Sequence, residues 1–238
     1  MGPEPDNTPV NNPDTGSKAT LKSQWADRQR TLGNTQRAVL FKNFPDSFNQ
    51  SLHAAHVQFI QRHMPAAAAS LLDVGCGFGR TSLPLKAAYP ALSFTGVELS
   101  EEFARVYQER IGPCFCGSVS DFTTDERFDV ITIITLLMYL SEDERDREVA
   151  RLGAMLKPGG RLIVIEPYFN FLTMMRRALK LRKLAPTGGE VRYFSRDELE
   201  HQLAAALPTF KRLETRLFGM PVTGLPRLHI GIAMAIPN

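Results

Sequence analysis

The chain has 238 residues, of which 43% are hydrophobic and 22% charged, a composition that suits one globular domain with a sizeable core. A formal net charge of +3 is too small to indicate a nucleic-acid partner, and three cysteines do not form a disulfide framework, which favours a reducing cytoplasm. The longest apolar run, Val130 to Leu140, is too short to span a bilayer, and the first residues lack the pattern of a signal peptide.

The N-terminal part of the chain changes character at about residue 19. Residues 1–18 are rich in Pro, Asn, Asp and Gly and are predicted to be a disordered tail. Apolar residues at helical spacing then predict three helices, over 19–32, 36–44 and 48–63.

After residue 70, short β-rich runs alternate with helical stretches. The predicted strands are 71–74, 92–97, 113–116, 130–135, 161–165, 210–218 and 228–235. The predicted helices between them are 80–88, 101–111, 142–156, 171–184 and 196–205. This alternation indicates βαβ units and a mainly parallel sheet. The runs ITIIT and RLIVI lack polar alternation, as expected for central strands covered on both faces.

The stretch LLDVGCGFGR, residues 71–80, places three glycines at alternate positions directly after a predicted strand. A dinucleotide-binding loop has its third glycine three residues after the second, whereas here Gly79 follows Gly77 by two residues. The turn therefore predicts a different ligand; the alternative is a turn that serves packing alone.

Two acidic residues narrow the choice of ligand. Asp73 ends the first strand of this pattern, where a carboxylate repels a pyrophosphate but suits an ammonium group. Glu98 ends the next strand, 25 positions later, where an acid accepts hydrogen bonds from both ribose hydroxyls. A ribose joined to a cationic tail without phosphates describes S-adenosylmethionine, which we predict as the cofactor.

Five segments in order resemble class I S-adenosylmethionine-dependent methyltransferases. LLDVGCGFGR and GVELS are similar to the first two motifs of that family, and FDVITIITLLMYL, LKPGGRLIVIEP and YFSRDELEHQLAAA are similar to later segments. The likeness covers residues 68–236. It implies an α/β fold with a Rossmann-like, mainly parallel seven-stranded sheet in the order 3-2-1-4-5-7-6, helices on both faces and an antiparallel last strand. It also implies an N-terminal helical lid over residues 19–66 and an S-adenosylmethionine-binding methyltransferase domain over residues 67–238.

The resemblance assigns roles to residues around the glycine loop. Gly75 and Gly77 let the backbone approach the methionine portion of the cofactor, and Asp73 lies beneath the loop and orients it. Glu98 holds the ribose, and Leu99 packs on the adenine.

The segment after the third predicted strand differs from the usual sequence of the family. Where many members have Gly-Asp-Ala, this chain has Gly117, Ser118 and Val119, so Ser118 replaces the carboxylate that meets the adenine amino group, with Asp121 as a substitute. The predicted cofactor-binding residues are Asp73, Gly75, Gly77, Glu98, Leu99, Ser118, Val119 and Thr135.

The methyl acceptor has a weaker sequence signature than the cofactor. Because the leaving group on the sulfonium is already good, the reaction needs mainly alignment of the reacting atoms and a dry pocket. Tyr139 follows the fourth strand, where many small-molecule members have a histidine. It is the first catalytic candidate, either orienting the acceptor or packing. Glu166, just past the fifth strand, is a further candidate.

Histidines on the predicted lid are the other catalytic candidates. His53 and His56 lie three residues apart on one helix, so one of them is placed to reach the acceptor; the alternative is one surface and one half-buried histidine. No third ligand has suitable spacing, so no metal is predicted. Trp25, on the first helix, either caps the cofactor or anchors its helix.

The segment FNFLTMMRRALKLRKL, residues 169–184, is basic and amphipathic. It predicts either a solvated basic face on a lid helix or a contact with an anionic, lipid-like or membrane-bound partner, of which the first is favoured.

Together these features predict a cytoplasmic enzyme that transfers a methyl group from S-adenosylmethionine to an O, N or activated C atom of a small molecule, in a setting such as secondary metabolism. The alternatives are a lipid or isoprenoid-linked acceptor at a membrane surface, and an S-adenosylmethionine-fold protein that does not methylate. No nucleic-acid partner is expected, and the oligomeric state stays open.

Overall fold

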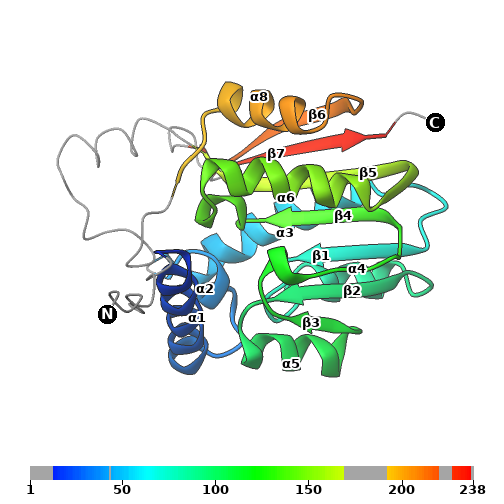
Figure 1. Cartoon of the computed structure of the whole chain (residues 1–238). Coiled ribbons are helices and arrows are strands. Elements are labelled where there is room, and N and C mark those ends of the chain that lie inside the picture. The colour runs from blue at the N-terminus through cyan, green and yellow to red at the C-terminus, as the bar shows by residue number, and fades with distance from the viewer. Residues whose placement is uncertain (1–12, 43, 169–191, 220–226, 237–238) are drawn as a thin grey trace, which may run out of the picture.

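The computed structural model describes residues 13–42, 44–168, 192–219 and 227–236. Its centre is one seven-stranded sheet with the strand order β3-β2-β1-β4-β5-β7-β6, which confirms the predicted order (Figure 1). The strands are β1 (Ser70–Val74), β2 (Ser93–Glu98), β3 (Cys114–Cys116), β4 (Phe128–Ile134), β5 (Leu156–Pro167), β6 (Lys211–Gly219) and β7 (Arg227–Ala235).

Strands β1 to β5 pair in parallel, whereas β7 runs antiparallel to both β5 and β6. The described helices are α1 (Pro13–Leu32), α2 (Gln36–Val39), α3 (Asp46–Arg62), α4 (Ser82–Ala88), α5 (Glu101–Arg110), α6 (Glu142–Ala154) and α8 (Arg196–Ala206), with short 3-10 turns η1 (Val119–Asp121) and η2 (Leu137–Tyr139).

Helices cover both faces of the sheet because the central strands are apolar on both sides. One core packs α3, α4 and α5 against the sheet through residues such as Phe59, Leu85 and Tyr107. The other packs α6 and α8 through residues such as Val149 and Leu199. The predicted two-sided α/β fold is therefore confirmed.

A third, smaller apolar cluster attaches the N-terminal helices. Ala38 of α2 is buried together with Phe78, Phe103 and Val106, and the partly buried Trp25 of α1 packs against them. Figure 1 shows α1 and α2 at the edge of the sheet where β1, β2 and β4 end. This is the edge at which ligands bind in open parallel sheets.

Several predicted boundaries were wrong. Helix α1 begins at Pro13, inside the predicted tail, and proline suits a first helical position because its ring presets φ. Helix α2 ends at Val39 rather than at residue 44. Strand β5 begins at Leu156 rather than at residue 161, because Leu156 already pairs with Phe128 of β4. The predicted helix over 171–184 lies outside the described residues.

Within the described segments, no helix combines the length and the apolar character that a membrane crossing requires.

Candidate functional site

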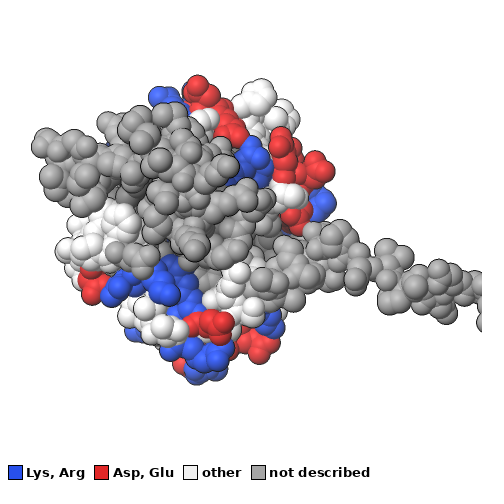
Figure 2. Space-filling model, turned by 90° about the vertical axis from the view of Figure 1, so that its left-hand side faces the viewer, with Lys and Arg blue, Asp and Glu red and all other residues white. Residues whose placement is uncertain are grey.

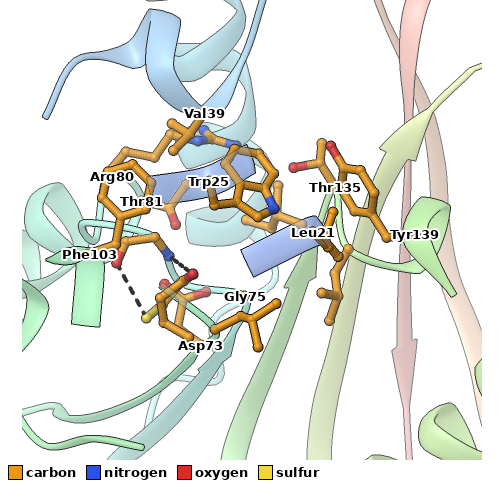
Figure 3. A pocket seen from close by; sticks show the side chains of 16 residues that line it. Leu21, Trp25, Val39, Asp73, Gly75, Arg80, Thr81, Phe103, Thr135 and Tyr139 are labelled. Atoms are coloured by element: carbon orange, nitrogen blue, oxygen red, sulfur yellow. Dashed lines mark hydrogen bonds between the residues drawn. The ribbon is translucent and has the colours of Figure 1, made fainter. Parts of the chain in front are cut away.

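A cavity opens at the carboxyl ends of β1, β2 and β4, beneath α1 and α2 (Figure 3). Residues from both halves of the chain line it: Leu21, Trp25, Val39, Asp73, Gly75, Cys76, Gly77, Arg80, Thr81, Glu98, Leu99, Phe103, Ile134, Thr135, Leu136 and Tyr139. Six of the eight predicted cofactor residues are in this set, and so is the predicted catalytic Tyr139.

The glycine loop is tied to β2 by its backbone. The N–H groups of Gly75 and Cys76 both donate to the carbonyl of Val97, at 2.8 and 3.1 Å. Gly77 has a φ of 56°, a left-handed conformation that favours glycine, and it faces the cavity. Gly79, with a φ of 81°, has a different role: a Cβ there would lie 1.9 Å from Ile111, so the third glycine permits close packing against α5.

The Glu98 carboxylate joins the glycine loop to the start of α5. One oxygen, Oε2, accepts from Gly77 N at 2.8 Å, and Oε1 accepts from Ser100 N at 2.8 Å. Burial raises the pKa of Glu98, while these backbone donors lower it. A carboxylate has about four acceptor positions, so two remain for a ligand's hydroxyl groups. Sequence reasoning predicted a contact with the ribose, which stays a prediction, and missed the structural role of this residue.

Asp73 lies at the end of β1 and is 2% exposed. Its carboxylate accepts from Ser82 Oγ at 2.6 Å and from Thr132 Oγ1 at 2.9 Å. Burial raises its pKa, and the two hydroxyl donors lower it. Asp73 contributes a second acidic group to the cavity lining, and its predicted role in orienting the loop stays a prediction.

Arg80, which sequence reasoning did not single out, directly follows the third glycine. Its side chain is buried, with Nη1 3.4 Å from His53 Nδ1 and Nη2 3.4 Å from His56 Nδ1. Burial lowers the pKa of Arg80 to about 10 and the charge of Asp73 raises it, so the guanidinium stays charged at neutral pH. Because these two partners are histidine nitrogens rather than carboxylates, the cavity lining carries a positive charge that a ligand anion can pair with.

The two histidines predicted as catalytic support Arg80 instead of facing the cavity. His56 is fully buried, and its ring stacks on His229 with the Nε2 atom 3.0 Å from His229 Nδ1. Neither His53 nor His56 lines the cavity. Burial, aided by the charge of Arg80, lowers the pKa of His53 to about 4. These surroundings keep the histidines neutral and turn them toward the guanidinium, so the assignment as bases for an acceptor is corrected.

Helix α1 closes the cavity on the side away from the sheet. Trp25 meets the ring of Tyr139 edge-on with 5.8 Å between the ring centroids, and the Arg28 guanidinium lies 5.3 Å from the Trp25 ring centroid. Figure 3 shows Trp25 between the side of the cavity formed by Arg80 and the side formed by Thr135 and Tyr139. Trp25 therefore both anchors its helix and covers the cavity, which joins the two readings left open by the sequence.

Two predicted cofactor residues lie outside the cavity lining. Ser118 bonds to Ser120 through its hydroxyl at 2.9 Å, and Val119 is buried in the core on η1. Their contact with adenine stays a prediction. Cys76 lines the cavity with its Sγ atom 3.7 Å from that of Cys114, and burial raises its pKa, so it suits packing rather than attack.

Comparison with known proteins identifies the domain type. Residues 71–160 match the family model described as a methyltransferase domain. The chain is 28% identical over 205 residues to tRNA N(3)-cytidine methyltransferase METTL2 of Danio rerio, covering 77% of this chain and 56% of that protein. It is 34% identical over 117 residues to dTDP-4-amino-2,3,4,6-tetradeoxy-D-glucose N,N-dimethyltransferase of Saccharopolyspora spinosa, covering 48% of this chain and 45% of that protein. The chain thus spans about half the length of these relatives.

A solved structure shares the whole architecture. The 1,6-didemethyltoxoflavin-N1-methyltransferase of Burkholderia thailandensis, with bound 1,6-didemethyltoxoflavin and S-adenosylhomocysteine, superposes with a TM-score of 0.68 at 18% identity. The match covers 98% of this chain and 94% of that one. At this level of identity the likeness concerns the fold.

The neutral histidines make the fold sensitive to acid. The pKa of His53 is lowered to about 4, by burial first, and that of His229 to about 3, again by burial first. On acidification the unfolded chain binds these protons before the folded chain does. The stability that the neutral histidines contribute is therefore fully present above about pH 6.5 and is lost as the pH falls toward about 4. Urea unfolding at several pH values in this window measures the slope of the free energy of unfolding against pH. We expect His53→Gln to reduce it and His201→Gln, on the exposed face of α8, to leave it unchanged; equal slopes for His53→Gln and the unsubstituted chain would contradict this account.

The double role of Glu98 is testable by an isosteric change. In Glu98→Gln the amide nitrogen opposes one of the two backbone donors, so one N–H is left without an acceptor. We expect the free energy of unfolding to fall by about 1–3 kcal/mol, measured by chemical denaturation. Glu101→Gln, whose side chain is 70% exposed, is the control and should cost less than about 1 kcal/mol. Equal stability of the two variants would show that the Glu98 carboxylate does not hold the loop.

Proposed function

Since residues 71–160 form a methyltransferase domain within the class I S-adenosylmethionine-dependent methyltransferase fold, we propose that this chain methylates a small molecule at an O, N or activated C atom. The observation that carries the proposal is the enclosed cavity beneath α1, where two carboxylates, one guanidinium and several aromatic rings meet at the end of the glycine loop.

The residues of the cavity fit S-adenosylmethionine, which is the cofactor of this class. Glu98 is suited to its ribose diol, because both carboxylate oxygens keep an acceptor position. Arg80 offers a positive charge to the carboxylate of the amino-acid portion, and Asp73 offers a negative charge that suits the ammonium group. Leu99 and Phe103 supply apolar surface. When bound, the cofactor supplies a methyl group on a positively charged sulfur that leaves as a neutral thioether.

The chain's own contribution is alignment and the exclusion of water. Leu21 and Trp25 cover the cavity from α1, while Ile134 and Leu136 form its wall at the end of β4. A dry, preorganised cavity holds the two reacting groups in line, which replaces the entropy cost of a bimolecular encounter. Tyr139, at the boundary between the wall and the lid, is the residue that we assign to orienting the acceptor.

An acceptor of modest size is supported by two observations. Leu21 and Trp25 of α1 line the cavity together with residues at the ends of β1, β2 and β4, so the lid helix forms part of its wall. A 34% identical relative is an N,N-dimethyltransferase of a nucleotide-linked amino sugar. An amine on a sugar-like or heterocyclic molecule is therefore the first acceptor class to examine.

A second candidate is RNA, because the relative matched over 77% of this chain is a tRNA cytidine methyltransferase. RNA binding favours a continuous basic surface. Figure 2 views the edge that carries the cavity, and the described part of this face shows Lys and Arg side chains beside Asp and Glu side chains. The two candidates are therefore separated by the choice of acceptor in a methyl-transfer assay. The lipid acceptor depends on residues 169–184, outside the described residues.

The experiment is a methyl-transfer screen with three groups of acceptors. Amino sugars and heterocyclic amines, phenols, and unmodified tRNA are each incubated with the chain and S-adenosylmethionine, and products are identified by mass. We expect transfer to a small amine or phenol; transfer to tRNA alone would replace the proposal with the second candidate. Calorimetry with S-adenosylhomocysteine is run in parallel, and absence of binding would contradict the cofactor assignment itself.

The charge of Arg80 predicts a graded loss of cofactor affinity. In Arg80→Gln the cofactor's carboxylate loses its cationic partner, so we expect the Kd for S-adenosylhomocysteine to rise on the order of tenfold, about 1.4 kcal/mol. Arg80→Lys keeps the positive charge and should retain more of the affinity. Calorimetry measures both, and thermal unfolding confirms that each variant is folded. Unchanged affinity in Arg80→Gln would show that Arg80 does not face the carboxylate.

A further inference from the structure

The turn that carries Tyr139 starts in a strained backbone conformation. Thr135, directly after β4, has a φ of 54°. Among the described residues, every other residue with a positive φ is a glycine. For a β-branched side chain this region is sterically unfavourable, so the surrounding structure must hold it in place. Its own N–H donates to Ile165 O at 2.8 Å, which secures the start of the turn but not the residues that follow.

The residues that follow are held by one carboxyl group. Glu166, near the end of β5, is fully buried, and its Oε1 atom accepts from Leu136 N at 2.9 Å and from Leu137 N at 2.8 Å. Its Oε2 atom lies 3.3 Å from Met138 N. Three successive N–H groups directed at one acidic group form an anion-binding turn whose anion comes from the chain itself.

No lysine or arginine of the described residues forms an ion pair with Glu166. Burial raises its pKa, whereas the three backbone donors and the charge of Arg145 lower it. A buried acidic group is costly unless its acceptors are satisfied, so the turn and the glutamate stabilise one another. A glutamine cannot replace it fully, because its amide nitrogen would oppose a backbone N–H.

The turn contributes three residues, Thr135, Leu136 and Tyr139, to the cavity. Leu136 lies beside the glycine loop, where a Cβ on Gly75 would be 3.3 Å from its Cδ1 atom. Tyr139 N donates to Leu136 O at 3.0 Å, and the Tyr139 ring contacts Trp25 of the lid. A shift of the turn therefore moves the wall of the cavity and the lid contact together.

From this geometry we propose that Glu166 is a positioning residue: its buried side chain holds the turn 135–139 so that Leu136 and Tyr139 form the acceptor side of the cavity. It does not itself line the cavity, and it acts through the backbone of the turn. The proposal rests on the proposed function for the meaning of an acceptor side, while its structural content is independent of the acceptor.

The chain's single tryptophan provides the readout, because Trp25 packs on Tyr139. In Glu166→Gln we expect a red shift of Trp25 emission and stronger quenching by acrylamide, since the turn moves and Tyr139 no longer covers the indole. The control is Glu148→Gln, another buried glutamate (3% exposed) that bonds to Arg147 and Arg151 on α6, away from the cavity. It should lower thermal stability without changing Trp25 emission.

A double substitution separates positioning from general loosening. Tyr139→Ala removes the ring that covers Trp25, so Glu166→Gln added to it should cause no further shift in emission or quenching. Wild-type emission and quenching in Glu166→Gln would overturn the proposal, as would a full additional shift in the double variant. If Glu166→Gln does not fold, Glu166→Asp keeps the acidic group on a shorter stem and is measured in the same way, with the same two outcomes decisive.

These measurements test the role of Glu166 whether or not the proposed function is correct. Failure of the unsubstituted chain to bind S-adenosylhomocysteine would remove the function, yet the Trp25 readout would still decide whether Glu166 holds the turn. Once an acceptor is known, we expect Glu166→Gln to lower kcat and raise KM for the acceptor by a larger factor than it raises the Kd for S-adenosylhomocysteine, because Leu136 also lies beside Gly75 of the glycine loop. A change in that Kd alone, with acceptor kinetics intact, would place the effect of Glu166 on the cofactor and contradict the proposal.

Discussion

The site depends on the carboxylate at the end of β2. Glu98 accepts one N–H from the glycine loop and one from the first turn of α5, so a single side chain fixes two backbone segments relative to the sheet. Both segments end at the cavity, and Glu98 is itself part of the cavity lining. The residue that we propose as the ribose acceptor thus also shapes the loop, and a glutamine in its place would satisfy only one of the two donors.

Charge balance in the cavity follows from burial. Asp73 and Glu98 are acidic and Arg80 is basic, and none of the three is exposed by more than 8%. Asp73 is satisfied by hydroxyl groups, Glu98 by backbone amides, and Arg80 by histidine nitrogens. This arrangement places two acidic groups and one positive charge at the cavity, and Asp73 and Arg80 also attract one another. A ligand that carries an ammonium group, a carboxylate and a ribose diol complements it, and the methionine and ribose portions of S-adenosylmethionine have these groups.

The acceptor side is held by a different device. Here the backbone of η2 is oriented by Glu166, and its side chains meet the lid helix through Tyr139 and Trp25. The two sides of the cavity therefore have separate supports, one on β2 and one on β5. This separation allows acceptor recognition to vary while the cofactor side is kept, in accord with a fold whose members methylate different molecules.

The residues by themselves predicted the alternating strands and helices of a mainly parallel sheet, the glycine loop and the two acids at the strand ends, because these depend on local periodicity and on motifs within a few residues. The sheet order followed from the resemblance to class I S-adenosylmethionine-dependent methyltransferases. The sequence did not reveal that Arg80 carries the cavity's positive charge, that His53 and His56 contact it, or that His229 stacks on His56. These residues come together only when α3 packs against the sheet that contains β7. The sequence offered Glu166 only as a catalytic candidate and did not reveal its contacts with the turn, because its partners Leu136 to Met138 lie some 30 positions away and present backbone groups rather than a motif. A hydrogen bond to a backbone N–H leaves no residue signature, so only the tertiary structure decided which buried acids hold the loops of this site.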